Sequence, residues 1–244
     1  MTPSPISRHS QIASQLEARF SPQAIATSRR RAARVRRYWT WRREVGGRAK
    51  RVLDIGVSAG LLVAGLPFFA ALAVVIKADS SGPVLFRQTR IGRGGQPFGM
   101  WKFRSMHVDA ERRRAELATQ NESAGGVLFK MRHDPRVTRV GRFIRRASID
   151  ELPQLWNVLK GDMSLVGPRP PLAAEVKSYG QRELRRLDVV PGITCLWQIS
   201  GRSDLSFPQQ IELDLAYINR QTFKADVAIL ARTIPAVVTA RGAY

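Results

Sequence analysis

The sequence predicts a mainly helical α+β protein in which a bent membrane helix precedes a compact domain with short strands. Three observations support this fold class. Residues 52–76 are apolar and contain a single charged side chain, Asp54. Short runs of β-branched and aromatic residues lie next to glycine turns after residue 80. Farther on, apolar residues recur at the three- and four-residue spacing of helices.

Composition limits the size of the fold and the kinds of partner. The chain has 244 residues, of which 44% are hydrophobic, and this is enough to form a core. The formal net charge of +21 indicates polyanionic partners, namely nucleic acid, anionic lipid headgroups or phosphorylated substrates. Cys195 is the single cysteine, so no intrachain disulfide can form, in keeping with a reducing compartment.

Residues 1–50 are expected to form a basic, partly disordered arm. Its first 11 residues lack a continuous apolar stretch, so we expect no cleavable signal peptide. Between residues 29 and 51, eleven arginines and lysines face one acid, Glu44, and Tyr38, Trp39 and Trp41 lie among them. Three interpretations fit this composition: a solvated arm, an arm on an anionic membrane surface, or an arm that binds nucleic acid.

Residues 51–78 are predicted to form a re-entrant membrane helix. As a helix, residues 52–76 would be about 37 Å long, against a hydrocarbon core of about 30 Å, so length permits a span. Cations flank the segment on both sides, however, and both flanks therefore qualify as cytoplasmic. Pro67, next to Gly65 and Leu66, can bend the helix so that it leaves on the side it entered. A straight span and a buried core helix are the alternatives.

Residues 79–244 are predicted to form the compact domain. Residues 84–86 and 98–103 read as two strands joined by a glycine turn, and residues 106–122 as a polar helix. Apolar positions indicate one helix before the acids at 150 and 151 and another after them. A short strand precedes the proline turn at residues 168–171, residues 191–202 read as a loop with a short strand, and amphipathic helices are expected near 208–220 and 225–240.

The acids at 150 and 151 permit two interpretations. Residues 148–151, Ser-Ile-Asp-Glu, fit a helix capping box with Ser148 at the N-cap and Glu151 at N3. Acids in a first helical turn also complement the helix dipole, so a structural role is sufficient. On the other interpretation, the helix-start N–H groups and the arginines within residues 142–146 keep Asp150 ionised. An ionised carboxylate in a cationic pocket can act as a nucleophile toward phosphorus.

Four further cations are candidates for binding phosphate. Phosphoryl chemistry requires that the phosphate oxygens be neutralised by arginine, lysine or a divalent ion before an anion approaches. Lys102 and Arg104 lie in "WKFRSM", Arg169 in "GPRP" and Arg202 in "SGRSD". Each could instead be an ordinary surface cation. Arg169 is the strongest candidate, because its flanking prolines fix the backbone and so help to present the guanidinium.

Other kinds of site find little support. The three histidines are scattered and Cys195 is alone, which argues against a zinc site and against a Cys/His nucleophile. The sequence contains no G-x-x-x-x-G-K-[ST] loop, and "GRGG" at 92–95 is a glycine turn and not a dinucleotide fingerprint.

Taken together, these stretches resemble the bacterial sugar transferase family, the monotopic phosphoglycosyl transferases, especially those that start exopolysaccharide repeat units. The resemblance covers residues 51–244, with the motifs in the order of the family. The matching stretches are "GPVLFRQTRIG", "WKFRSM", "DPRVTRVGRFIRRASIDELPQLWNVLKGDMSLVGPRP", "PGITCLWQISGR", "ELDLAYI" and "GAY". The family moves a sugar-1-phosphate from a UDP-sugar to undecaprenyl phosphate.

The resemblance implies a role for each site residue. Asp150 would be the nucleophile that attacks the β-phosphorus, releases UMP and holds the phosphosugar covalently until undecaprenyl phosphate takes it. Glu151 would assist, and both carboxylates would help to hold Mg²⁺. The remaining residues would bind the nucleotide sugar: Lys102, Arg104, Pro168, Arg169, Pro170 and Arg202.

The resemblance also implies a location. The re-entrant helix would anchor the chain in the bacterial inner membrane, the catalytic domain would lie on the cytoplasmic face, and amphipathic helices would lie at the interface. Anionic lipids are then expected partners, nucleic acid is not, and a homodimer is compatible with the sequence. Many relatives have four further transmembrane helices, so this chain is expected to be the compact form.

Two positions depart from the pattern of the family. Leu66 precedes Pro67 where relatives often have serine, and this makes the re-entrant geometry less well supported. Cys195 occupies a position that is usually glycine, and this would cost stability if the position requires a positive φ.

The sequence leaves an alternative function and the identity of the sugar open. A non-catalytic basic protein that binds anionic lipid or nucleic acid would have the same composition. The apolar segment and the ordered motifs weigh against it. The motifs are compatible with glucose, galactose or an N-acetylated sugar.

Overall fold

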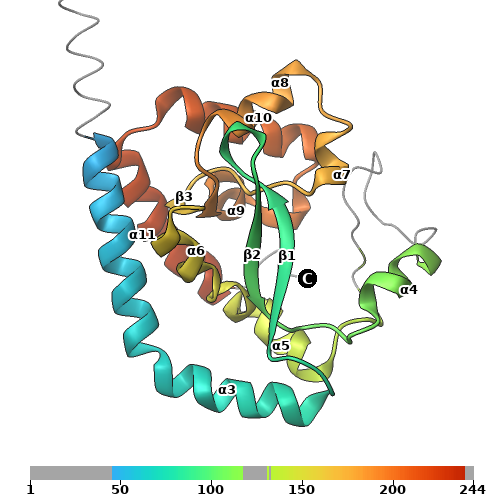
Figure 1. The fold of residues 1–244 in the computed structure, drawn as a ribbon. Coiled ribbons are helices and arrows are strands. Elements are labelled where there is room, and N and C mark those ends of the chain that lie inside the picture. The colour runs from blue at the N-terminus through green and yellow to red at the C-terminus, as the bar shows by residue number, and fades with distance from the viewer. Residues whose placement is uncertain (1–45, 118–130, 132, 240–244) are drawn as a thin grey trace, which may run out of the picture. The chain divides into compact units, whose positions relative to one another are not determined.

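The computed structural model describes residues 46–117, 131 and 133–239 (Figure 1). Most of the arm expected at residues 1–50 lies outside this part, and its last five residues are helical. Ala49–Tyr244 form one compact unit, separate from Met1–Arg48. Short strands and many helices make up the described part, so the predicted α+β class is confirmed.

Two apolar helices, Gly46–Ala64 and α3 (Leu66–Asp79), meet at an angle of 61°. Gly65 forms the turn between them, and Pro67 lies in the first turn of α3. Proline has no N–H with which to continue the hydrogen bonding of the preceding helix, and this accounts for the bend that was predicted at this point. In the described ranges no single helix is long and apolar enough to cross a membrane, whereas this pair meets both criteria together.

A β-hairpin follows α3 and supports one side of the site. Strands β1 (Leu85–Ile91) and β2 (Pro97–Phe103) are antiparallel, with Leu85 opposite Phe103 and Ile91 opposite Pro97. The connecting turn contains the short helix η1 (Arg93–Gly95), where Gly94 and Gly95 have positive φ. Both predicted strands and the glycine turn are confirmed, and the first strand is longer than its apolar core suggested.

Helix α5 (Arg139–Arg146) is tied at its start to the end of α3. The Thr138 hydroxyl accepts a hydrogen bond from the N–H of Gly141 at 2.9 Å, and the Asp79 carboxylate accepts one from the N–H of Val140 at 3.1 Å. These side-chain acceptors satisfy N–H groups that have no partner within the helix. The polar helix predicted at 106–122 corresponds in the described residues to α4 (Ala110–Glu116), and residues 118–122 lie outside them.

A second, parallel pair of strands places the proline turn. β3 (Ser164–Val166) pairs with β4 (Gly192–Thr194), and Ser164 lies opposite Gly192. The backbones approach so closely after β3 that a Cβ on Gly192 would lie 2.0 Å from the nitrogen of Gly167. Only glycine fits at such a contact, and the proline turn leaves β3 from this point.

The remaining helices surround these strands (Figure 1). The short helices lie between residues 149 and 204, and the two long helices form the C-terminal end. They are η3 (Ile149–Glu151), α6 (Gln154–Lys160), α7 (Ala173–Val176), α8 (Gln181–Leu184), η4 (Arg185–Asp188), α9 (Leu196–Ser200), η5 (Arg202–Asp204), α10 (Phe207–Arg220) and α11 (Phe223–Thr239). The two C-terminal helices are confirmed, and α11 contains Pro235. The prediction of a loop after the short strand at 192–194 was wrong for residues 196–200, which are helical.

Two buried apolar clusters hold the domain together. One includes Leu155 and Val158 of α6 and Tyr217 of α10. The other joins α3 to the hairpin and α5, and its buried members are Leu72, Ile76, Phe103 and Ile144. One side of α3 therefore packs against the domain, so it cannot be lipid-facing all round.

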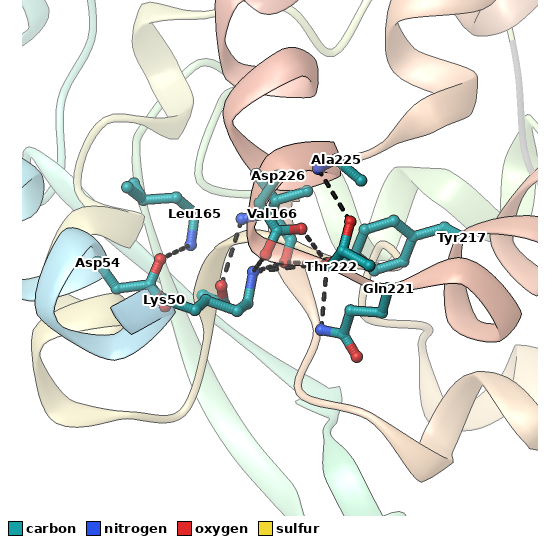
Figure 2. Close-up of polar contacts among 10 residues, drawn as sticks. Lys50, Asp54, Leu165, Val166, Tyr217, Gln221, Thr222, Ala225 and Asp226 are labelled. Carbon is teal, nitrogen blue, oxygen red and sulfur yellow. Dashed lines mark hydrogen bonds and ion pairs between the residues drawn. The ribbon is translucent and has the colours of Figure 1, made fainter. Parts of the chain in front are cut away.

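The base of the first helix is fixed to the domain by a buried polar network (Figure 2). The Lys50 ammonium lies 2.9 Å from the Asp226 carboxylate of α11 and donates to the carbonyl oxygen of Val166 at 2.8 Å. The Tyr217 hydroxyl donates to the same carboxylate at 2.7 Å. One turn along the helix, the Asp54 carboxylate accepts from the N–H of Leu165 at 3.0 Å. The only charged residue of the apolar segment is therefore used to dock it on β3.

Candidate active site

The carboxylate pair lies in η3, one sharp turn after α5. Ser148 has a left-handed backbone, with φ 55°, and its side chain makes no capping hydrogen bond. The predicted capping box is therefore wrong: the N–H of Glu151 donates to the backbone carbonyl of Ser148, and the Glu151 side chain turns elsewhere. A left-handed serine costs about 1–2 kcal/mol and persists where the surrounding structure enforces it, often at functional sites.

Two cations from distant parts of the chain converge on Glu151. Lys102, in β2, places its ammonium 2.9 Å from Glu151 Oε1 and 3.9 Å from Asp150 Oδ2. Arg169, in the proline turn, places Nη1 3.4 Å from the same Oε1 atom. Four of the predicted site residues thus form one cluster. Arg169 is the most accessible of them, with a side chain 36% exposed, against 10–16% for the other three.

The two carboxyl groups have opposite pKa shifts. Burial would raise the pKa of Glu151, but Lys102 and Arg169 outweigh it and lower that pKa to about 2. For Asp150, burial raises the pKa, Lys102 opposes this effect, and the negative charge of Glu151 adds to it. Arg145, one of the arginines expected to favour the ionised form of Asp150, does act to lower this pKa, but burial outweighs the nearby cations and the net shift is upward. Adjacent carboxyls whose environments separate their pKa values commonly have different chemical roles.

The backbone of the proline turn is held at four successive carbonyl groups. The Pro168 carbonyl accepts from the N–H of Gly192 at 2.9 Å, and the Pro171 carbonyl from the N–H of Ile91 at 2.9 Å. The two carbonyls between them are paired with buried arginine side chains. Arg186 Nη2 donates to the Arg169 carbonyl at 3.1 Å, and Arg90 Nη1 donates to the Pro170 carbonyl at 3.0 Å. The turn therefore has a fixed backbone below an accessible guanidinium.

Arg186 is itself held by two side chains. Its Nε atom lies 2.9 Å from Asp214 Oδ2 of α10, and Nη1 donates to the Tyr179 hydroxyl at 2.6 Å. Asp214 is fully buried. Burial raises the pKa of this carboxyl from 3.8 to about 6, although Arg186 acts in the opposite direction.

Asn157 connects the helix after the carboxylates to the strand that carries Lys102. Its side-chain oxygen accepts from the N–H of Trp101 at 3.0 Å, and its side-chain nitrogen donates to the Gly99 carbonyl at 2.8 Å. Asn157 is fully buried, so both contacts are made in a low-dielectric interior where unpaired groups are costly. These two contacts hold α6 and β2 in a fixed relative position beside the site.

The other predicted site residues have mainly structural contacts in the described part. The buried Arg104 guanidinium donates to the carbonyls of Ile76 and Ser80 at 3.2 and 2.6 Å, so it closes the C-terminal end of α3. Arg202 has φ 52°, and its Nε donates to the Gln198 carbonyl at 3.3 Å. The substrate-binding roles predicted for these two arginines stay predictions.

Pro168 and Pro170 lie beneath the surface and not on it. Both rings are fully buried, so in this structure they fix the turn and present Arg169, and their contact with a nucleotide stays a prediction. Cys195 is also buried, with φ −151°, an extended conformation open to any residue. The positive φ that would have made cysteine costly at this position is absent.

Several important residues were not identified from the sequence. Arg90, Arg186 and Asp214 are buried charges, and Asn157 is a buried amide. Arg90, Asn157 and Asp214 do lie within quoted motifs, those that contain "FRQTRIG", "LWNVLK" and "ELDLAYI", so position within a motif was the available signal. Their partners could not be read, because each contact joins segments that are distant along the chain.

The arrangement suits the handling of a phosphorylated substrate. A partly accessible arginine and a lysine lie beside a carboxylate, Asp150, that accepts no hydrogen bond from the described residues and is 3.9 Å from Lys102. Such cations can neutralise phosphate oxygens while the carboxylate approaches phosphorus. Within the described ranges no group of three or more His, Cys, Asp or Glu side chains could hold a metal ion by itself.

Comparison with known proteins gives a consistent result. Residues 45–240 match the family model described as bacterial sugar transferase. Galactosyl transferase CpsE of Streptococcus agalactiae serotype III is 47% identical over 197 residues, which is 80% of this chain and 43% of that protein. Exopolysaccharide production protein ExoY of Sinorhizobium fredii is 38% identical over 205 residues, which is 83% of this chain and 91% of that protein.

A third relative has a more specific name. The UDP-glucose:undecaprenyl-phosphate glucose-1-phosphate transferase of Caulobacter vibrioides is 42% identical over 203 residues, which is 80% of this chain and 72% of that protein. The chain thus spans less than half the length of CpsE and most of the length of the other two.

The raised pKa of Asp214 predicts a pH dependence of stability. The folded protein keeps a proton on this carboxyl at pH values where the unfolded chain has lost it, so the free energy of unfolding decreases as the pH rises from about 4 to about 6. The change in pKa corresponds to about 3 kcal/mol. In melting curves recorded across that range, the purified wild type should become less stable as the pH rises. Asp214→Asn has no carboxyl at this position and should not show this loss.

The exposed Asp188 provides the control. Asp188→Asn should keep the wild-type dependence on pH. Parallel curves for the wild type and Asp214→Asn would contradict the assignment.

Proposed function

The chain belongs to the bacterial sugar transferase family, and on this basis we propose that it transfers a hexose-1-phosphate from a UDP-sugar to undecaprenyl phosphate. The predictions of this family and of an enzyme, a phosphoglycosyl transferase, are confirmed. The alternative of a non-catalytic basic protein is thereby set aside. The proposed reaction would be the first membrane step in the assembly of an exopolysaccharide.

In the proposed reaction Asp150 acts as a covalent nucleophile. One carboxylate oxygen attacks the β-phosphorus of the UDP-sugar, the bond from that phosphorus to the bridging oxygen breaks, and UMP leaves with the electron pair. The sugar phosphate is then an acyl phosphate on Asp150. A phosphate oxygen of undecaprenyl phosphate attacks the same phosphorus, forms the lipid diphosphate sugar and restores the carboxylate.

One observation supports this assignment above the others: Glu151 engages the cations closely, and Asp150 has only a long ion pair with Lys102. Lys102 and Arg169 both contact Glu151 Oε1, whereas Lys102 is 3.9 Å from Asp150. A carboxylate fixed in two ion pairs is a poor nucleophile, and a neighbour without such contacts is the better one. Glu151 then holds Lys102 and Arg169 where they can also contact the diphosphate, and Arg202 is proposed to contact the nucleotide.

Magnesium is the proposed cofactor. Mg²⁺ typically keeps several waters and binds through one or two carboxylates together with substrate phosphates, so the absence of a three-carboxylate cluster in the described residues is compatible with it. Asp150 and the second oxygen of Glu151 would hold the ion, which would neutralise charge on the diphosphate when bound.

The sugar is proposed to be a hexose. One relative is named for galactose and another for glucose, so the names leave both sugars open. Measuring UMP release with a panel of UDP-sugars would identify the preferred donor.

We propose that the bent helix pair enters and leaves the bacterial inner membrane on its cytoplasmic face. Cations flank the apolar segment on both sides, which favours the cytoplasm for both ends. Large apolar side chains are exposed on these helices, including Val52, Val63, Leu66 and Val74 at 62–72% exposed. Such a surface suits contact with lipid, and anionic lipids are the proposed partners of the basic flanks.

Replacing the nucleophile should stop the first half of the reaction. We expect Asp150→Asn to lower UMP release from the donor UDP-sugar by about 1,000-fold or more, because an amide cannot form the acyl phosphate. The assay uses detergent-solubilised protein with Mg²⁺ and undecaprenyl phosphate. Mass spectrometry of wild type quenched during turnover should find the phosphosugar on the peptide that contains Asp150.

The exposed Asp188 again supplies the control, and Asp188→Asn should release UMP at about the wild-type rate. Full activity in Asp150→Asn would reject the nucleophile assignment.

Removal of magnesium should reversibly stop the same reaction. EDTA is expected to abolish UMP release, because the charge on the diphosphate then opposes the approach of the carboxylate. Excess Mg²⁺ should restore the rate. Unchanged release in EDTA would contradict a role for the metal.

Topology can be tested without any activity. Tags fused to the two ends of the chain should be equally protected from a protease added to intact cells. A tag that is cleaved at one end only would indicate a true span in place of a re-entrant helix.

A further inference from the structure

The proposed chemistry leaves three buried charges without a task. Arg90, Arg186 and Asp214 are each at least 93% buried, and none of them contacts Asp150 or Glu151. Removing charged groups from water is costly, and a buried ion pair is weak evidence for stability by itself. Stability alone therefore does not explain these buried charges, and a role in shaping the site is the better explanation.

The two arginines contact the same segment, the proline turn. Arg186 and Arg90 donate to the consecutive carbonyls of Arg169 and Pro170, at 3.1 and 3.0 Å. The three prolines of this turn have no N–H groups, and the four carbonyls of residues 168–171 are all paired with donors from elsewhere. Without these arginines, the carbonyls of Arg169 and Pro170 would lose these partners.

Each arginine is itself fixed by its other edges. Gln88 Oε1 accepts from Nε and Nη2 of Arg90, at 3.0 and 2.7 Å. Asp214 and Tyr179 hold Arg186 in the same way, at 2.9 and 2.6 Å. The planar fork of a guanidinium is suited to such a function, since several donors of fixed geometry point in different directions.

We propose that Arg90 and Arg186 are positioning residues that set the backbone of Arg169, so that its guanidinium meets Glu151 and the phosphates of the substrate. The role of Arg169 toward substrate rests on the function proposed above. The contact between Arg169 and Glu151 does not depend on that function, so the effect of Arg90 and Arg186 on this contact can be tested separately.

The side chain of Arg169 needs such support. It is 36% exposed, and its contact with Glu151 is long, at 3.4 Å. A long, accessible side chain is poorly held by one weak ion pair. Its position is therefore determined largely by its backbone, where misplacement by about 1 Å can lower activity by about 100-fold.

A double-mutant cycle on activity tests whether Arg186 acts through Arg169. We expect Arg186→Met to lower kcat/KM for the UDP-sugar by about 10- to 100-fold in the wild type, and by less than about twofold when Arg169→Ala is already present. Arg90→Met should show the same dependence on Arg169. Arg185→Met is the matched control, since Arg185 is exposed, is next in sequence and contacts Asn219 instead.

Equal losses in both backgrounds would overturn the proposal, because a merely structural effect on the domain does not depend on Arg169. Melting temperatures of all variants are recorded in parallel. If Arg186→Met does not fold, Arg90→Met and Tyr179→Phe provide the same comparison.

A structure of Arg186→Met or Arg90→Met gives a test that needs no turnover. We expect the separation of Arg169 Nη1 from Glu151 Oε1 to increase from 3.4 Å. An unchanged separation would overturn the positioning role. A displaced Arg169 in a protein whose wild type releases no UMP would instead support positioning and reject the proposed function.

Discussion

The site depends on one carboxylate oxygen, Glu151 Oε1, which is shared by a lysine from the hairpin and an arginine from the proline turn. Three segments that are distant along the chain meet at this atom. The shared contact offsets part of the cost of burying this carboxylate, because both cations stabilise its negative charge. It also leaves Asp150 beside two cations without being bound tightly by either. The acid that is most strongly paired therefore organises the cluster, and its less engaged neighbour is the residue that we propose reacts.

The support for this contact extends outward in layers. Asn157 keeps β2 in register with α6, so Lys102 and the carboxylates approach from fixed directions. On the opposite side, backbone N–H groups and two buried arginines hold every carbonyl from Pro168 to Pro171. The three prolines of the turn supply rigidity but no N–H donors, and neighbouring segments supply the donors for its carbonyls. This arrangement explains why the domain contains buried charges that no reaction step uses.

The apolar helices are joined to the same framework. Asp54 and Lys50 dock the first helix on β3 and α11 (Figure 2). Leu72 and Ile76 of α3 share a cluster with Phe103, the neighbour of Lys102. Arg104 closes the C-terminal end of α3 from the same strand.

The sequence by itself determined the local features of this protein. Apolar length and Pro67 predicted the bent helix, glycines predicted the hairpin turn, and motif order identified the family. The roles that the family resemblance implies for Asp150, Glu151, Lys102 and Arg169 stay predictions. Prediction from the sequence failed where local and long-range interactions compete. Ser148 and Glu151 fit a capping box, but the attraction of Glu151 to Lys102 and Arg169 was stronger than the cap. The pKa of Asp150 shifts upward and not downward because burial of this carboxyl outweighs the nearby cations. The partners of Arg90, Arg186 and Asp214 were decided only by the tertiary structure, because no spacing in a sequence encodes which distant carbonyl a buried guanidinium will meet.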